Sequence, residues 1–196
     1  MASADGIAQA AALLREGGLV AFPTDTVYGI GCRGGDEQAL EAVFAAKRRP
    51  PEKRVALLVA SLEQAAGRGY LADERAHRLA DAFWPGGLTL VLPPAADGET
   101  QAFRAPDHPV ALALIERAGP LATSSANRSG EPETFDADDV AIAFADTDLL
   151  DAILDGGTVP GGVASSVVDL SVEPARLLRE GAIERDRLEA VIGPID

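Results

Sequence analysis

Short apolar segments alternate with amphipathic segments along this whole chain, and this alternation restricts the possible folds more than any other feature. Residues 19–23 (LVAFP), 55–60 (VALLVA) and 88–93 (LTLVLP) are short apolar runs that predict buried strands. Between them, residues 37–46 and 73–85 carry apolar side chains at helical spacing. Strands interleaved with helices predict an α/β fold, with a twisted, mixed, open sheet flanked by helices.

The rest of the chain continues the same pattern. Residues 165–171 and 175–181 predict a pair of strands, and residues 136–154 predict a helix in two pieces. We find no linker, internal repeat or low-complexity tract, so we expect one domain over residues 1–196.

Charge and composition exclude several classes of function. The chain has 17 Lys and Arg against 31 Asp and Glu, and its net charge of −14 argues against general affinity for nucleic acid or anionic lipid. No apolar run is long enough to span a bilayer, and the N-terminus is unlike a signal peptide. One cysteine, Cys32, and two histidines, His77 and His108, give no metal-ligand spacing. We therefore expect a cytoplasmic protein without a metal site of its own or a membrane partner.

Positive charge is concentrated in one segment, residues 47–54 (KRRPPEKR). This segment holds five of the 17 cations, including both lysines of the chain, Lys47 and Lys53. Its two prolines restrict the backbone, so the loop loses less entropy when its cations bind an anion. Arginine offers a planar fork for phosphate oxygens and lysine offers a point charge. The segment favours polyanion binding over its alternative, a solvated surface turn.

Two polar stretches follow predicted strands. Residues 23–29 (PTDTVYG) and 123–132 (TSSANRSGEP) supply hydroxyls, an amide and free backbone N–H groups where ligands often bind. Local turn hydrogen bonds explain residues 23–29 slightly better than ligand binding does, and they explain residues 123–132 equally well. Neither a GxxxxGK[ST] nor a GxGxxG pattern occurs, which argues against a P-loop or a Rossmann nucleotide site. Arg104 and Arg179 end extended segments, and each considered singly is better explained as a surface ion pair.

Seven stretches, in this order, resemble the YrdC/Sua5 family, the threonylcarbamoyl-AMP synthases. They span residues 23 to 183, and it is the ordered set that is specific. The stretches are PTDTVYGIG (23–31), KRRP (47–50) with K-x-V-x-L-L-V (53–59), FWPGGLTLVL (83–92), FRAPDHP (103–109), TSSANRSGEP (123–132), SSVVDL (165–170) and LLREGAI (177–183). The chain looks like the short, single-domain form of the family.

The resemblance implies an enzyme, a nucleotidyltransferase of tRNA processing. The family joins L-threonine, bicarbonate or CO2, and ATP into threonylcarbamoyl-AMP and pyrophosphate, with Mg2+ carried by the ATP phosphates. Other proteins, the tRNA threonylcarbamoyl transferases, then use the adenylate to form N6-threonylcarbamoyladenosine at position 37 of tRNA. The family fold is an open α/β sheet with a positively charged crevice.

The resemblance also implies a role for individual residues. Lys47 and Arg49 are expected to be catalytic, and Asn127 is expected in the pocket. The ATP-binding residues implied are Arg49, Lys53, Thr100, Ser125 and Arg179. The threonine-binding residues implied are Thr26, Arg104, Thr123 and Ser165. Some relatives hold threonine with a histidine, and this chain has Leu58 at that position.

Two other functions compete with this one. An RNA-binding module of the same family, making at least weak RNA contacts, is disfavoured by the net charge of −14. A carbamoyl-adenylate enzyme of the hydrogenase-maturation type would carry a Cys-rich zinc region, and this chain has one cysteine.

Overall fold

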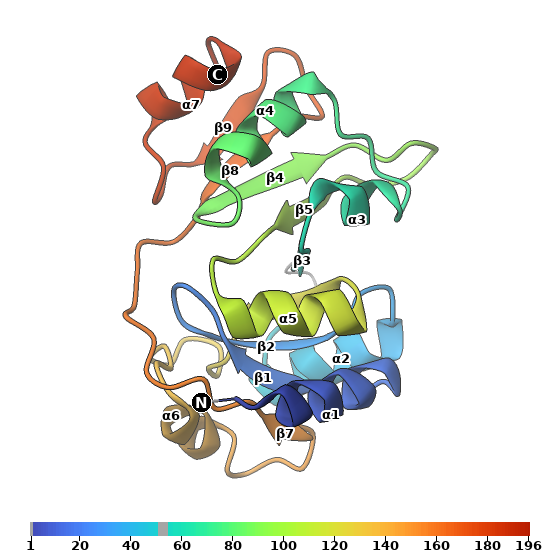
Figure 1. Cartoon of the computed structure of the whole chain (residues 1–196), viewed down its shortest axis with the longest axis vertical. Coiled ribbons are helices and arrows are strands. Elements are labelled where there is room, and N and C mark those ends of the chain that lie inside the picture. Colours follow the sequence, from blue (N-terminus) through green and yellow to red (C-terminus); the bar gives the residue numbers. More distant parts are fainter. Residues whose placement is uncertain (1, 51–54) are drawn as a thin grey trace.

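A single nine-stranded sheet forms the centre of the computed structural model, which describes residues 2–50 and 55–196 (Figure 1). The strands follow the spatial order β7-β1-β2-β6-β3-β5-β4-β8-β9. Their bounds are β1 (Val20–Pro23), β2 (Tyr28–Arg33), β3 (Ala56–Leu58), β4 (Leu88–Leu92), β5 (Gln101–Arg104), β6 (Leu121–Ser125), β7 (Ala152–Ile153), β8 (Ser166–Asp169) and β9 (Arg176–Arg179).

The sheet is mixed and open, as the alternation of apolar and amphipathic segments predicts. Three neighbouring pairs are parallel (β1 with β7, β3 with β5, β4 with β8), and the other five are antiparallel. The edge strands β7 and β9 lie at opposite ends of the order, so the sheet does not close into a barrel. The predicted fold class and the predicted strand pair near the C-terminus are both confirmed.

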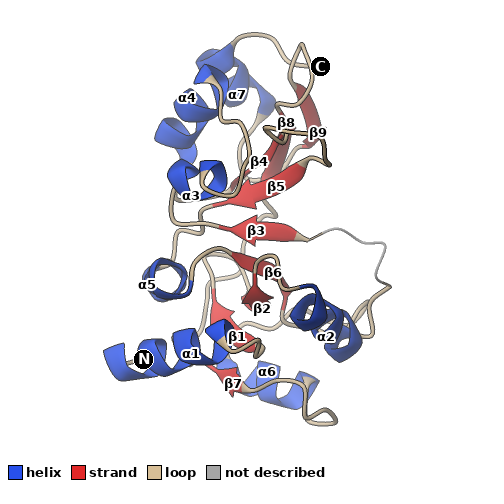
Figure 2. Ribbon diagram, turned by 90° about the vertical axis from the view of Figure 1, so that its right-hand side faces the viewer, coloured by secondary structure: helices blue, strands red, loops and turns tan. Residues whose placement is uncertain are grey.

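Helices lie on both sides of the sheet, with α5 and α2 on opposite sides in Figure 2. Their bounds are α1 (Ala4–Arg15), α2 (Glu37–Lys47), α3 (Leu62–Ala66), α4 (Glu74–Phe83), α5 (Pro109–Ala118), α6 (Ala137–Ala143) and α7 (Arg185–Ile192). Side chains cap most of the helix starts: Ser3, Asp36, Asp73 and Asp136 each accept a hydrogen bond from a backbone N–H of the first turn. These caps satisfy donors that a helix cannot pair internally, which fixes where each helix begins.

Two apolar clusters hold the layers together. The larger cluster packs α2 and α4 against the sheet, and the smaller cluster packs α1 and α5 against β1. Strand β1 contributes to both clusters, with Ala21 in the larger one and Phe22 in the smaller one. Because both of its faces are covered, β1 is apolar at every position.

The prediction of a two-piece helix over residues 136–154 is wrong in its second half. Only α6 is helical, and Ala152–Ile153 forms β7 beside β1. The Asp151 carboxylate accepts a hydrogen bond from Leu19 N at 2.8 Å, and Asp151 N donates to Leu19 O at 3.0 Å. These two hydrogen bonds join residues more than 130 positions apart and place the segment beside the sheet. Local hydrophobic periodicity cannot predict a contact of this kind.

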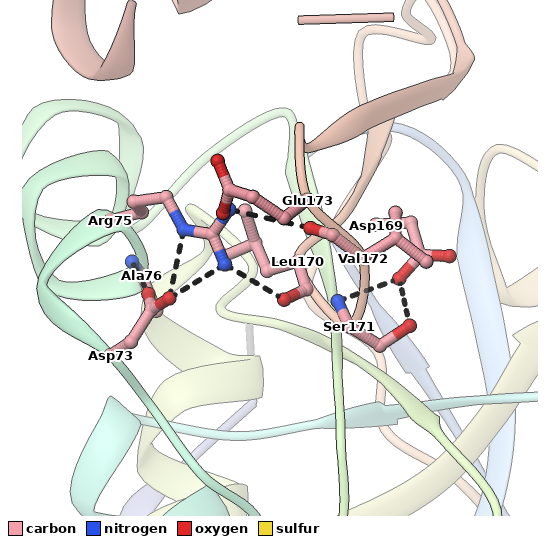
Figure 3. A network of polar contacts seen from close by, with 8 residues as sticks. All are labelled: Asp73, Arg75, Ala76, Asp169, Leu170, Ser171, Val172 and Glu173. Carbon is pink, nitrogen blue, oxygen red and sulfur yellow. Dashed lines mark hydrogen bonds and ion pairs between the residues drawn. The ribbon is translucent and has the colours of Figure 1, made fainter.

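Arg75 ties α4 to the turn that follows β8 (Figure 3). Its guanidinium donates to the carboxylates of Asp73 and Glu173, and to the carbonyl oxygens of Leu170 and Val172. Exposed ion pairs contribute little to stability, so the bonds to backbone oxygens are the stronger constraint. The network fixes the β8–β9 hairpin, which carries part of the site described below.

Within residues 2–50 and 55–196, no helix has both the length and the apolar character needed to cross a bilayer.

Candidate active site

Two adjoining cavities of about 320 Å³ each lie at one end of the central strands. The loop-side cavity is bordered by Arg49, Glu133, and Gly162 and Ala164 of the segment that connects β7 to β8 along one side of the molecule (Figure 1). The sheet-side cavity is more apolar and is bordered by residues of β2, β3, β4 and β8. The shared wall consists of Thr26, Val27, Ala56, Arg104, Thr123, Ser125, Ser165 and Arg179.

The sheet topology explains this convergence. Strands β5, β6 and β9 end where their antiparallel neighbours β4, β2 and β8 begin, so polar residues distant in sequence meet at one edge. A glycine keeps the space open: a Cβ at Gly29 would lie 2.9 Å from Thr123 Cγ2. Any side chain at that position would therefore fill part of the sheet-side cavity.

The structure brings together seven of the eleven residues that the sequence predicts for the site. The seven that line these cavities are Thr26, Arg49, Arg104, Thr123, Ser125, Ser165 and Arg179. Thr100 precedes β5 and is outside the described lining of both cavities. Lys53 lies outside the described residues. Lys47 and Asn127 lie behind the cavity wall. Leu58, at the position of the relatives' histidine, gives the sheet-side cavity an apolar wall.

Arginines on three different elements face the loop-side cavity. Arg49 Nη1 donates to Ser124 Oγ at 2.7 Å, and burial lowers the pKa of the Arg49 guanidinium without removing its charge. Arg179 donates from Nε to Ser165 O at 2.9 Å and from Nη2 to Ser165 Oγ at 3.1 Å. Arg104 Nη2 donates to Asp25 Oδ2 at 2.6 Å. Hydrogen bonds therefore position each guanidinium before any ligand binds.

A tight turn positions Thr26. Thr24 Oγ1 donates to Val27 O at 2.6 Å, and Thr26 N donates back to Thr24 Oγ1 at 3.3 Å. This local bonding is the turn chemistry that the sequence allows, and it directs Thr26 toward both cavities. Thr24, Thr26 and Val27 thus form the turn and also line the cavities.

Lys47 is buried, at 2% exposure, beneath the C-terminal end of β6 and the residues that follow it. Its ammonium donates to Ser125 O, to Asn127 O at 2.5 Å and to Asn127 Oδ1 at 3.4 Å. Burial, followed by the nearby charges of Arg49 and Arg128, lowers the pKa of Lys47 to about 8. In this structure Lys47 supports the wall of the cavity from behind.

The described cations of the segment 47–54 therefore do not form one surface. Of its three described cations, Lys47 is buried, Arg48 is exposed and pairs with Asp146, and Arg49 alone lines the cavities. Helix α2 ends here with Arg48 at φ 50°, in the left-handed region. This reversal of the backbone separates the directions of the three side chains.

Several lining residues were missed by the sequence interpretation, notably Thr89 and Glu133. Thr89 Oγ1 and Ser165 Oγ are 2.8 Å apart in a buried hydrogen bond. In sequence, Thr89 is one polar residue within an apolar strand (LTLVL), and that isolation was the available signal. Glu133 is the one acidic side chain among the described lining residues, and nothing in the sequence distinguishes it from other surface carboxylates.

An α/β protein with this lining is suited to holding anionic ligands by hydrogen bonds. No cluster of three or more potential metal-ligating side chains occurs in the described part of the chain. The described lining contains hydroxyls and guanidiniums, and its polar groups suit phosphate and carboxylate oxygens.

Comparison with known proteins identifies the family. The Sua5/YciO/YrdC family model, which carries the description "Telomere recombination", matches residues 12–181, and the chain belongs to this family. It is 44% identical over 200 residues to threonylcarbamoyl-AMP synthase of Bacillus subtilis, and 43% identical over 195 residues to that of Pyrococcus abyssi. These matches cover 96% and 95% of this chain.

A solved structure gives the same result. The structure of P. abyssi Sua5 complexed with L-threonine superposes with a TM-score of 0.87 at 43% identity, covering 97% of this chain and 58% of that one. The chain spans 57% of the length of each of the two curated relatives.

Proposed function

We propose that this chain synthesises threonylcarbamoyl-AMP from L-threonine, CO2 or bicarbonate, and ATP. One observation carries the proposal: three pre-positioned arginines and a set of hydroxyls enclose two connected cavities, which suits two anionic substrates held side by side. The names of the relatives support this activity, and the relative of known structure binds L-threonine in its complex.

The two cavities suit different substrates. The loop-side cavity, with Arg49 and Arg179, suits the phosphates of ATP, and Ser125 adds a hydroxyl at the shared wall. Lys53 and Thr100 complete the ATP residues that the family resemblance implies. ATP would enter with its Mg2+ carried by the phosphates, as the family resemblance implies.

The sheet-side cavity suits threonine. Arg104 would bind the substrate carboxylate, and the hydroxyls of Thr26, Thr123 and Ser165 would surround its polar groups. Leu58 contributes an apolar wall where some relatives use histidine, so the hydroxyls here would carry the recognition of threonine. Asn127 and Lys47 hold Ser125 at the end of β6, which makes the catalytic contribution of Lys47 an indirect one.

The reaction then requires positioning and charge stabilisation. The threonine amine adds to CO2, forming a C–N bond and releasing a proton. A carbamate oxygen attacks the α-phosphorus of ATP in line, the bond from the α-phosphorus to the bridging oxygen breaks, and pyrophosphate leaves. Arg49 and Arg179 offset the charge that develops on the leaving group. No protein nucleophile takes part.

The product would pass to proteins that transfer the threonylcarbamoyl group to tRNA. We place this activity in the cytoplasm, where tRNA and ATP are available. The RNA-binding alternative has no specific support, because the net charge of −14 disfavours general affinity for nucleic acid.

Pyrophosphate release from ATP tests the proposal. We expect release to require both L-threonine and bicarbonate, and D-threonine to substitute poorly because its hydroxyl, carboxylate and reacting amine cannot all occupy their places at once. Release that is independent of threonine and of bicarbonate would reject the synthase activity. Affinity for RNA at physiological ionic strength without pyrophosphate release would favour the alternative.

A further inference from the structure

Asp25 is the central residue of the Thr24–Thr26 turn, and the proposed function gives it no role. Its Oδ2 accepts the hydrogen bond from Arg104 Nη2 at 2.6 Å, and the two side chains are 18% and 13% exposed. Its Oδ1 is buried and has no hydrogen-bond partner within the described residues. Arg104 is therefore the hydrogen-bonding partner that stabilises this carboxylate.

Arg104 is held at two points and still has donors to spare. Besides the bond to Asp25, its Nε donates to Gly86 O at 3.0 Å. A guanidinium has five N–H groups, so about three remain for a ligand. Arg104 lines both cavities, whereas Asp25 is outside the described lining of either. Asp25 can therefore affect a ligand through Arg104 and not by contact.

The charged groups near Asp25 differ in whether they can pair with its carboxylate. Burial lowers the pKa of the nearby His108 imidazole, so near neutral pH this side chain does not add a second cation for Asp25. Arg179 forms no ion pair within the described residues and bonds to the oxygens of Ser165 instead. Among the described residues, the cavity wall thus contains one arginine that is ion-paired with a carboxylate, Arg104, and another that is not, Arg179.

We propose that Asp25 is a positioning and specificity-determining residue: it orients Arg104 and offsets its charge, so that an amino-acid carboxylate binds there in preference to a phosphate. A triphosphate is attracted by total charge, whereas a carboxylate needs a correctly oriented fork. Pairing with Asp25 reduces the net positive charge that would attract a triphosphate, and it holds the Arg104 guanidinium in the orientation that a carboxylate needs. This inference rests on the proposed function, because it assigns Arg104 to the amino-acid substrate.

The test is equilibrium binding of L-threonine and of ATP to the full chain carrying Asp25→Asn, which removes the charge with little change of shape. We expect threonine affinity to fall by about ten- to a hundredfold, as for loss of a charged hydrogen bond, while ATP affinity stays unchanged or rises by up to about threefold. Excess ATP should now compete with threonine. The matched control is Asp107→Asn, which alters a nearby exposed carboxylate that makes no hydrogen bond to Arg104 in the described part of the chain, and it should leave both affinities within about twofold.

A double-mutant cycle separates positioning from general structural damage. If Asp25 acts through Arg104, then Asp25→Asn should cause no further loss of threonine affinity in a chain that already carries Arg104→Gln. Asp25→Glu, which keeps the charge, should recover part of the affinity. Unchanged threonine affinity in Asp25→Asn, equal losses for both ligands, or additive losses in the cycle would overturn the inference. If the unaltered chain binds ATP but no threonine, the proposed function fails as well.

Discussion

Replacing Arg49 with glutamine should lower kcat/KM for pyrophosphate release by roughly one to three powers of ten. Arg49 is positioned by its bond to Ser124 Oγ and faces the loop-side cavity, where the leaving pyrophosphate would gain charge. Removing a charged hydrogen bond of this kind costs about 1.5–4 kcal/mol in the transition state. The measurement is steady-state pyrophosphate release with ATP varied at saturating threonine.

The neighbouring arginine provides a matched control. Arg48 has the same charge, but its side chain is 65% exposed and pairs with Asp146. Arg48→Gln should therefore change kcat/KM by less than about threefold. If the two variants lose activity equally, total charge on the segment matters and the specific position of Arg49 does not.

Replacing Lys47 with methionine should reduce the free energy of unfolding by about 2–4 kcal/mol. The change keeps the apolar length of the side chain but removes the donor for the buried oxygens of Ser125 and Asn127. A buried acceptor without a donor costs about 1–3 kcal/mol. Urea unfolding of both chains measures the difference, and Arg48→Gln is again the control.

This difference should grow as the pH rises. Burial lowers the pKa of Lys47 from 10.5 to about 8, so between these values the unfolded chain binds more protons at Lys47 than the folded chain. The free energy of unfolding of the unaltered chain therefore rises through this window relative to the methionine variant. Below about pH 8, Lys47 is charged in both the folded and the unfolded chain, so the difference in the free energy of unfolding between the two variants is constant. A difference that shrinks from pH 8 to pH 10 would show that the ammonium is favoured in the folded protein.

The sequence predicts the fold well because most of its strands and helices have strong local signals. The apolar runs at 55–60 and 88–93 contain β3 and β4, and aspartates that precede amphipathic runs begin α2 and α4. Strand β7 is the exception, because its two residues become a strand by pairing with β1. Local patterns carry no information about such a distant pairing.

The sequence predicts which polar residues belong to the candidate site better than it predicts the directions of their side chains. Residue type and the family resemblance identify the polar side chains, and the sheet topology brings seven of them to two cavities. Neither could show that Lys47 turns inward while Arg48 turns outward, because that depends on the left-handed backbone at Arg48 and on oxygens almost 80 positions away. The partnership of Asp25 with Arg104 is equally distant, which is why a predicted turn residue becomes part of the wall's support.

Detection of the product by mass spectrometry tests the central claim most directly. The chain would be incubated with ATP, ¹⁵N-labelled L-threonine and ¹³C-labelled bicarbonate, and the nucleotides would be separated at once. We predict an adenylate that contains both labels, formed in equal amount to pyrophosphate. Formation of AMP and pyrophosphate with neither label in any adenylate, at substrate concentrations that saturate binding, would contradict the account.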